Sequence, residues 1–128
     1  MIEHHSREFV EAMHAEQLRL HGGAPGIRDE GMLESALARS RQKEAYGEPD
    51  LCELAAAYLF GIAKNHPFVD GNKRTAFAAA DLFLYFNGFS LEAEQADVIQ
   101  LVMMVAAGEI DEAGAAAFFR DHLVKLED

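Results

Sequence analysis

The segment "TAFAAADLFLYF", from Thr75 to Phe86, constrains the fold more than any other part of the chain. When it is drawn as a helix, apolar side chains occupy nearly every side. A helix without a polar face is stable only when neighbours surround it, so this one must be central and buried. Asn87 and Gly88 then end it, because glycine readily supplies the left-handed residue that follows a helix.

Capping residues and helix breakers divide the rest of the chain into further helices. Ser, Asp and Asn side chains accept hydrogen bonds at a helix start, whereas Gly and Pro end a helix. We expect helices that begin at Ser6, Asp29, Asp50, Asn72, Glu92 and Asp111, and that end near Leu20, within 40–49, and near Asn65, Asn87, Ala107 and Leu126. The polar segment 40–49, "SRQKEAYGEP", is interpreted as an exposed loop or flap. No stretch shows convincing strand periodicity, since "GFSL" is too short to count, so we predict an all-α bundle of about six helices.

Length and charge limit what such a bundle can do. The chain has 128 residues, enough for one core, so we predict a single domain over 1–128. It carries 22 Asp plus Glu against 11 Lys plus Arg, a net charge of −11. Such a surface repels nucleic acid and anionic lipid, so direct nucleic-acid or membrane binding is not expected. A basic partner, or a small anion at a local cationic cluster, is favoured instead.

The only cysteine and the amino-terminal sequence bear on the compartment. Cys52 has no partner in the chain for a disulfide, and it is interpreted as a core residue rather than a nucleophile. The first residues, "MIEHHSREFV", lack the apolar core of a signal peptide. We therefore expect a soluble cytoplasmic protein.

A polar cluster, "HPFVDGNKR" at 66–74, stands immediately before the central helix. The start of a helix presents unpaired N–H groups and a partial positive charge, which suit phosphate. Gly71 lets the backbone approach such a ligand closely. Lys73 and Arg74 put formal positive charge in the first turn, where it is unfavourable to the helix itself. An external anion accounts for that placement.

Two further side chains of the cluster add chemistry to an anion site. Asp70 would repel phosphate unless a hard cation such as Mg²⁺ joined the two. His66 is the side chain of the cluster suited to remove a proton near neutral pH. Base, metal ligand and anion clamp together indicate the transfer of a phosphate-containing group to a hydroxyl.

Each residue of the cluster also has a purely structural interpretation. His66 could cap helix carbonyls, Asp70 or Asn72 could cap the next helix, and Lys73 with Arg74 could be solvated surface charges. One site explains the whole cluster more economically than separate structural roles do. A metal hydrolase is disfavoured, because no histidine pair has the HExxH spacing. The other histidines are interpreted as surface or capping residues: His4, His5, His14, His21 and His122.

The cluster resembles the signature of the Fic/Doc proteins, which reads His, any, Phe, any, Asp or Glu, Gly or Ala, Asn, Gly or Lys, Arg. "GIRDEGMLESALAR" upstream and "TAFAAADLFLYFNGF" downstream are similar to the death-on-curing (Doc) branch. The resemblance covers roughly residues 20 to 90. It implies an all-α fold in which the motif loop joins two central helices.

The resemblance also implies roles for individual residues. His66 would be the general base that deprotonates the target hydroxyl, and Asp70 would hold Mg²⁺. Phosphates of ATP would be bound by Asn72, Lys73, Arg74 and the backbone near Gly71. Phe68 would anchor the loop in the core, and the segment 40–49 would supply a flap that positions a target peptide.

Within the family, two positions separate the branches. Fic enzymes that transfer AMP usually have Gly where Lys73 stands, and often a second Arg where Phe77 stands. Doc-type proteins have Lys at the position of Lys73, and they transfer the terminal phosphate of ATP to a translation factor. The resemblance therefore implies a toxin kinase that acts on a hydroxyl, a Thr of elongation factor Tu being the expected target. Because Gly71 replaces the Ala that is commoner in Doc, AMP transfer stays open as an alternative reaction. A non-catalytic, partner-binding relative is a third hypothesis.

Regulation by a separate antitoxin is also implied. Inhibitory helices of the family carry Ser or Thr, three residues, Glu, then Gly or Asn. The nearest match, Ser40 to Glu44, is followed by Ala45 and is interpreted as accidental. A basic antitoxin segment would suit the acidic surface. Met103 and Met104 are interpreted as packing residues, although an exposed patch there would allow a homodimer.

Overall fold

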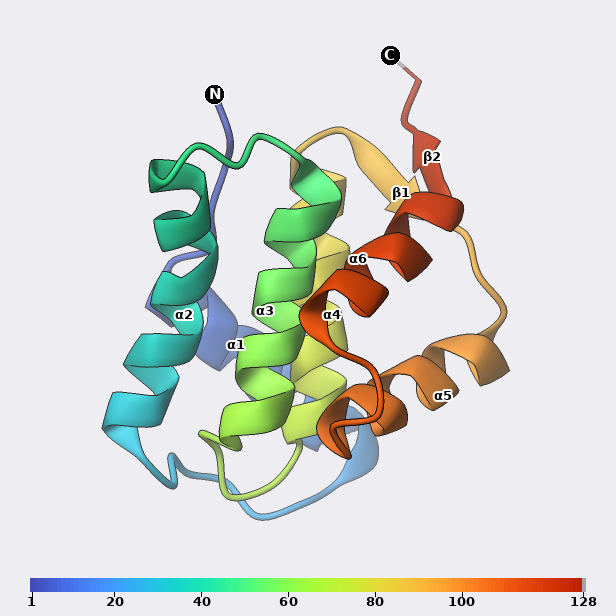
Figure 1. The fold of residues 1–128 in the computed structure, drawn as a ribbon. Coiled ribbons are helices and arrows are strands. Elements are labelled where there is room, and N and C mark those ends of the chain that lie inside the picture. Colours follow the sequence, from blue (N-terminus) through green and yellow to red (C-terminus); the bar gives the residue numbers. More distant parts are fainter. Residues whose placement is uncertain (128) are drawn as a thin grey trace.

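The computed structural model describes residues 1–127, which form six helices and two short strands (Figure 1). The elements are α1 (Arg7–His21), α2 (Glu30–Ala45), α3 (Leu51–Asn65), α4 (Asn72–Phe86), β1 (Phe89–Leu91), α5 (Gln95–Ala106), α6 (Glu112–Asp121) and β2 (Leu123–Lys125). The predicted all-α bundle of about six helices is confirmed in its helical part, and the family resemblance placed the motif loop correctly between α3 and α4.

The two central helices are α3 and α4, which run side by side through the middle of the molecule (Figure 1). α2 and α6 pack against α3, and α1 packs against α4. Small residues allow the close approach: a Cβ on Gly61 of α3 would lie 3.2 Å from the Cα of Ala36 on α2. Phe83 of α4 is fully buried, as the apolar pattern of that helix predicts.

The two strands correct the prediction that the chain has none. β1 pairs with β2 in antiparallel register, with Ser90 opposite Val124. The last helix therefore ends at Asp121 rather than near Leu126, and α5 begins at Gln95 rather than Glu92. Three residues carry too little periodicity to mark a strand, and each strand is defined by its distant partner, which supplies the backbone hydrogen bonds.

The polar segment 40–49 is a second correction, because most of it is helix rather than loop. Residues 40–45 belong to α2, and Ser40 is fully buried. Arg, Gln, Lys, Glu and Ala are good helix formers, and Lys43 forms an ion pair with Glu112 of α6. The rest of the segment, residues 46–49, leads into the start of α3, whereas His66 follows the end of α3. The 15 residues of α3 separate the two by about 22 Å along the helix axis, so this segment is no flap over the motif.

The amino-terminal histidines also differ from the prediction of surface positions. His5 is buried, and its Nε2 donates to the main-chain oxygen of Ala79, 2.8 Å away. Its own N–H donates to the hydroxyl of Tyr58 at 3.0 Å. Burial is the main cause that lowers the pKa of His5. His4 contacts Glu44, which ties the first residues across α2.

Cys52 follows the sequence-based expectation. Cys52 is 2 % exposed, and burial raises the pKa of its thiol to about 11, which confirms a core residue rather than a nucleophile. Among residues 1–127, no helix has both the length and the apolar character needed to cross a bilayer.

Candidate active site

The site is built where α3 ends, and His66 makes the turn. His66 is the C-cap of α3 and has left-handed backbone angles, φ 47° and ψ 56°. A non-glycine residue in this region costs roughly 1–2 kcal/mol, although histidine is among the residues that tolerate it best. Its N–H still donates to the oxygen of Ile62 at 3.2 Å, and its imidazole is exposed. The turn thus presents a free imidazole at the end of a rigid, buried helix.

Arg28 holds this strained turn from outside. Its Nε donates to the main-chain oxygen of His66 at 2.6 Å, and one terminal nitrogen donates to the oxygen of Asn65 at 2.8 Å. A guanidinium is well suited to two neighbouring acceptors because its donors form a rigid fork. Arg28 therefore fixes the backbone that carries the candidate base.

The connection between α1 and α2, residues 22–29, lies along the motif loop, and both are at the same end of the molecule in Figure 1. Ile27 forms an antiparallel bridge with Phe68. Pro67 accepts a hydrogen bond from the N–H of Arg28 at 2.7 Å, and Val69 donates to the oxygen of Gly26 at 3.0 Å. The segment beside the motif is thus 22–29.

Phe68 and Asn72 close the loop from inside. Phe68 is 1 % exposed, which confirms its anchoring role. The Oδ1 of Asn72 accepts from the N–H of Phe68, and its Nδ2 donates to the oxygen of Phe68, both at 2.9 Å. The side chain of Asn72 therefore shapes the loop and does not cap α4. Phosphate binding by Asn72 stays a prediction, for which its N–H group is available.

His14 of α1 contacts the motif loop at two points. Its ring stacks on Phe68, with centroids 3.8 Å apart and an interplanar angle of 9°. Its Nε2 donates to the main-chain oxygen of Asp70 at 2.8 Å. Since His14 is 6 % exposed, the expectation of a surface or capping residue is wrong. Gly71 passes close by, because a Cβ there would lie 3.5 Å from the His14 ring.

The start of α4 is open. Gly71 is its N-cap, with φ 78°, and provides no side-chain hydrogen bond. Among the residues that the structure describes, no acceptor pairs with the N–H groups of Asn72, Lys73 or Arg74. The side chains of Lys73 and Arg74 are exposed and form no ion pair with any residue from 1 to 127. Free N–H groups beside two unpaired cations are the arrangement that binds phosphate.

Asp70 lies beside this open helix start. Its side chain is exposed, and Oδ2 accepts a hydrogen bond from the N–H of Ala24 at 2.7 Å. It therefore does not cap α4, which was one of its structural interpretations. Within 1–127, no group of three or more His, Cys, Asp or Glu side chains is arranged to hold a metal ion. A cation at Asp70 would take its other ligands from water or a bound phosphate.

The structure thus brings together the residues that the motif singled out. His66, Asp70, Lys73 and Arg74 are all exposed in one short stretch between the end of α3 and the first turn of α4. Such a site can accept a proton, hold a hard cation and neutralise an anion. Two supporting residues, His14 and Arg28, were missed. The only sequence signal for Arg28 is the similarity of the segment "GIRDEGMLESALAR" to the Doc branch. No feature of the sequence around His14 marks it.

Comparison of the sequence with known proteins identifies its family. Residues 4–84 match the model of the Fic/DOC family. The chain belongs to the Fic/DOC family. It is similar to a protein named protein kinase Doc from Escherichia phage P1, with 37% identity over 120 residues, which cover 93% of this chain and 94% of that protein. It is also similar to a protein named toxin Doc from Mycolicibacterium smegmatis, with 50% identity over 76 residues, 57% of this chain and 58% of that protein.

The matched Fic/DOC region has a clear place in the fold. It begins before α1 and ends at Leu84, within α4, so it includes the motif loop and both supporting residues. α5, α6 and the strand pair follow it in sequence. The similarity to the phage protein extends over most of the chain and so reaches these elements as well.

Proposed function

We propose that this Fic/DOC protein is the toxin of a toxin-antitoxin pair and transfers the terminal phosphate of ATP to a protein hydroxyl. The observation that carries the proposal is the exposed His66 beside the open, doubly cationic start of α4. The name of the phage relative, protein kinase Doc, supports a kinase. The name of the mycobacterial relative supports a toxin.

The start of α4, with the N–H groups and side chains of Lys73 and Arg74, forms a candidate anion seat that would bind the phosphates of ATP. The N–H groups of Asn72, Lys73 and Arg74 point out of the helix start, and the two side chains add formal charge. Gly71 supplies the left-handed φ of 78° at the helix start, and the space that a Cβ would take there is already occupied by Leu18 and His14. These donors would neutralise the charge that develops on the transferred group, which is the main contribution of protein residues to phosphoryl transfer.

His66 would act as general base. Its neutral imidazole takes the proton of the target hydroxyl as the hydroxyl oxygen forms a bond to the γ-phosphorus. The bond between that phosphorus and the β,γ-bridging oxygen breaks, and ADP leaves with the electron pair. Arg28 would keep the imidazole aimed, because it binds the carbonyl of the residue that carries it.

Asp70 would hold Mg²⁺. The donor set fits, because a single exposed carboxylate next to a phosphate seat is the kind of site in which Mg²⁺ keeps water and phosphate ligands. When bound, the ion would neutralise phosphate charge. The hydrogen bond from the N–H of Ala24 holds the carboxylate in place beside the motif loop.

The target peptide would lie along residues 22–29 rather than along 40–49. Residues 22–29 already bridge to the motif loop through Ile27 and Phe68. The segment is largely exposed, and an exposed segment beside the motif loop offers a surface along which a peptide can bind. A target hydroxyl bound there would lie near His66, because Arg28 of this segment contacts the main-chain oxygen of His66.

Lys73 favours phosphate over AMP transfer as the reaction. By the family resemblance, a glycine at this position would leave room for the α-phosphate, and Phe77 one turn later supplies no second cation. AMP transfer to a protein hydroxyl is the alternative, and a non-catalytic partner-binding relative is a third candidate. The intact set of His66, Asp70 and Arg74 disfavours the third.

The proposed partners follow from this function. They are a separate antitoxin with a basic segment, suited to a chain of net charge −11, and elongation factor Tu, with a Thr as acceptor. Such a toxin would act in the cytoplasm and inhibit translation. A homodimer is proposed through α5, where Met103 is exposed while Leu101 is buried.

The test is intact-mass spectrometry of elongation factor Tu incubated with this protein, ATP and Mg²⁺. A His66→Ala variant serves as the control. Addition of one phosphate by the unmutated protein alone is expected. Addition of AMP would replace the proposal by its alternative, and no addition would contradict this target. Labels on the α- or γ-phosphate of ATP distinguish the two reactions independently.

A further inference from the structure

A groove bounded by α4, β1, α5 and α6 lies outside the candidate active site. Its walls include Phe77 and Asp81 of α4, Leu91 of β1, Val98 of α5 and Phe118 of α6, and its volume is about 230 Å³. Sites that enclose a small-molecule ligand measure roughly 300–1,000 Å³. This groove, hereafter the α4–α6 groove, therefore suits one or two side chains of a partner better than a cofactor.

Asp81 is the charged residue in the wall of the groove. Its carboxylate is half-buried, and among residues 1–127 it has no hydrogen-bond donor and no ion-pair partner. Burial alone raises the pKa of Asp81. A carboxylate that loses water contacts without gaining a partner is destabilised, and a cation that reaches it relieves that cost.

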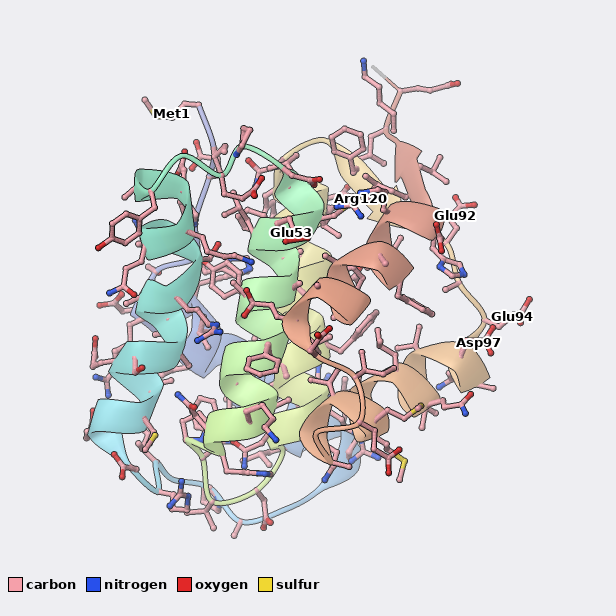
Figure 2. The ribbon with its side chains drawn as sticks, viewed as in Figure 1. Met1, Glu53, Glu92, Glu94, Asp97 and Arg120 are labelled. Carbon is pink, nitrogen blue, oxygen red and sulfur yellow. The ribbon has the colours of Figure 1, made fainter. Side chains whose placement is uncertain are left out.

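The protein's own nearby arginine does not meet this need. Arg120 follows Phe118 by two residues, but it turns to the start of α3, where it bonds Asp50 at 2.8 Å and lies 3.6 Å from Glu53. Figure 2 shows Arg120 and Glu53 together at that end of α3. Since no cationic side chain among residues 1–127 pairs with Asp81, the cation that we consider for it comes from another molecule.

The rim of the groove has the same sign of charge as its wall. Glu92, Glu94 and Asp97 are exposed along the connection from β1 into α5, on one edge of the molecule (Figure 2). Carboxylates around an apolar groove raise the local concentration of a basic partner and speed its association. Acidic or neutral partners gain nothing from them.

We propose that the α4–α6 groove binds a basic segment of a partner protein, in which one arginine or lysine reaches Asp81 and apolar neighbours pack on Phe118 and Val98. Arginine suits the site best, since its guanidinium is weakly hydrated and stacks on aromatic rings. The groove starts beyond the residues that would carry phosphate transfer. The proposal therefore stands whether or not the chain is a kinase.

Selection from a random peptide library displayed on phage tests the chemistry of the partner. The baits are the unmutated chain, Asp81→Asn, and Glu8→Gln as a matched control, because Glu8 is exposed on α1 and does not line the groove. Asp81→Asn should fold at least as well as the original, since burial disfavours the charged carboxylate. We expect peptides with an arginine or lysine between apolar residues to be enriched on the unmutated and Glu8→Gln chains and lost on Asp81→Asn.

Fluorescence anisotropy with the best enriched peptide gives the magnitude. Asp81→Asn should bind it about tenfold more weakly or worse, equivalent to about 1.4 kcal/mol, while Glu8→Gln binds it as tightly as the original. Replacing the peptide's arginine with citrulline should produce a similar loss on the unmutated chain. The proposal is overturned if no peptide is enriched, if the enriched peptides lack a cation, or if Asp81→Asn binds as well as the original.

Discussion

The imidazole of His14, on α1, donates a hydrogen bond to the main-chain oxygen of Asp70, 56 positions later, over 2.8 Å. The same ring stacks on Phe68 at 3.8 Å. One buried side chain therefore fixes two points of the motif loop, of which one is the backbone of the candidate metal ligand. The loop is held by a helix that contributes no candidate catalytic group.

His14→Phe should separate the two contacts, because it keeps the stacked ring and removes the donor. The oxygen of Asp70 then loses its partner, so we expect the free energy of unfolding to fall by about 1 kcal/mol or slightly more. His14→Ala removes the ring as well and should cost about 3 kcal/mol. Urea denaturation measures both, with His21→Phe at the exposed end of α1 as control. Equal stability of His14→Phe and the original would show that the hydrogen bond does not hold the loop.

The helices could be predicted because their signals are local. Ser6 and Asp29 cap α1 and α2 as predicted, accepting from N–H groups three residues later. The apolar run of α4 likewise marks a central helix within its own sequence. The strand pair could not be predicted, since Leu91 and Leu123 are paired only by the packing of everything between them.

In the candidate site, too, the residues close together in the sequence could be predicted and the long-range contacts could not. The composition of 66–74 was enough to single out His66 and the anion seat, because the whole cluster lies in one short stretch. The clamp by Arg28 and the support by His14 depend on contacts across 38 and 56 positions. A flap was expected in 40–49 from its polarity and from the family resemblance, but polarity also describes the solvated face of α2.

Arg28→Ala should loosen the turn at His66 without removing any group that would bind ATP. We expect slower transfer with little change in the KM for ATP, because the candidate base loses its fixed backbone. Unfolding should become easier by about 1 kcal/mol, since the last carbonyls of α3 return to water. Arg19→Ala, which removes an arginine that pairs with Glu16 on the surface of α1, is the control and should leave the rate unchanged. If Arg28→Ala kept the full rate, the clamp would be unnecessary for positioning.

His66→Ala and His66→Gly should both abolish transfer. Histidine at φ 47° carries backbone strain that glycine does not, while glycine costs more entropy on folding. We therefore expect both variants to unfold within about 1 kcal/mol of the original, because an exposed loop side chain contributes little packing. Circular dichroism with urea measures stability, and the mass assay measures transfer. Substantial residual transfer in either variant would remove His66 from the role of base.

Lys73→Gly and Lys73→Gln should separate charge from space at the start of α4. Both remove the cation, so both should slow phosphate transfer. Only glycine also opens the space beside the helix start, so only Lys73→Gly should allow AMP to be added. Labelled ATP, with the label on the α- or the γ-phosphate, reads out the two products. A Lys73→Gly variant that retained the full rate of phosphate transfer would show that Lys73 is an ordinary surface charge.

Acid should destabilise the protein through His5. Burial, with smaller contributions from His4 and Arg41, lowers the pKa of His5 from its ordinary 6.5. The folded state therefore binds fewer protons than the unfolded chain, so this contribution is fully present above pH 6.5 and is lost as the pH falls from there through the folded-state pKa. Urea denaturation between about pH 5 and 8 should show this slope, and His5→Gln should flatten it. A slope unchanged in His5→Gln would assign the acid sensitivity to other groups.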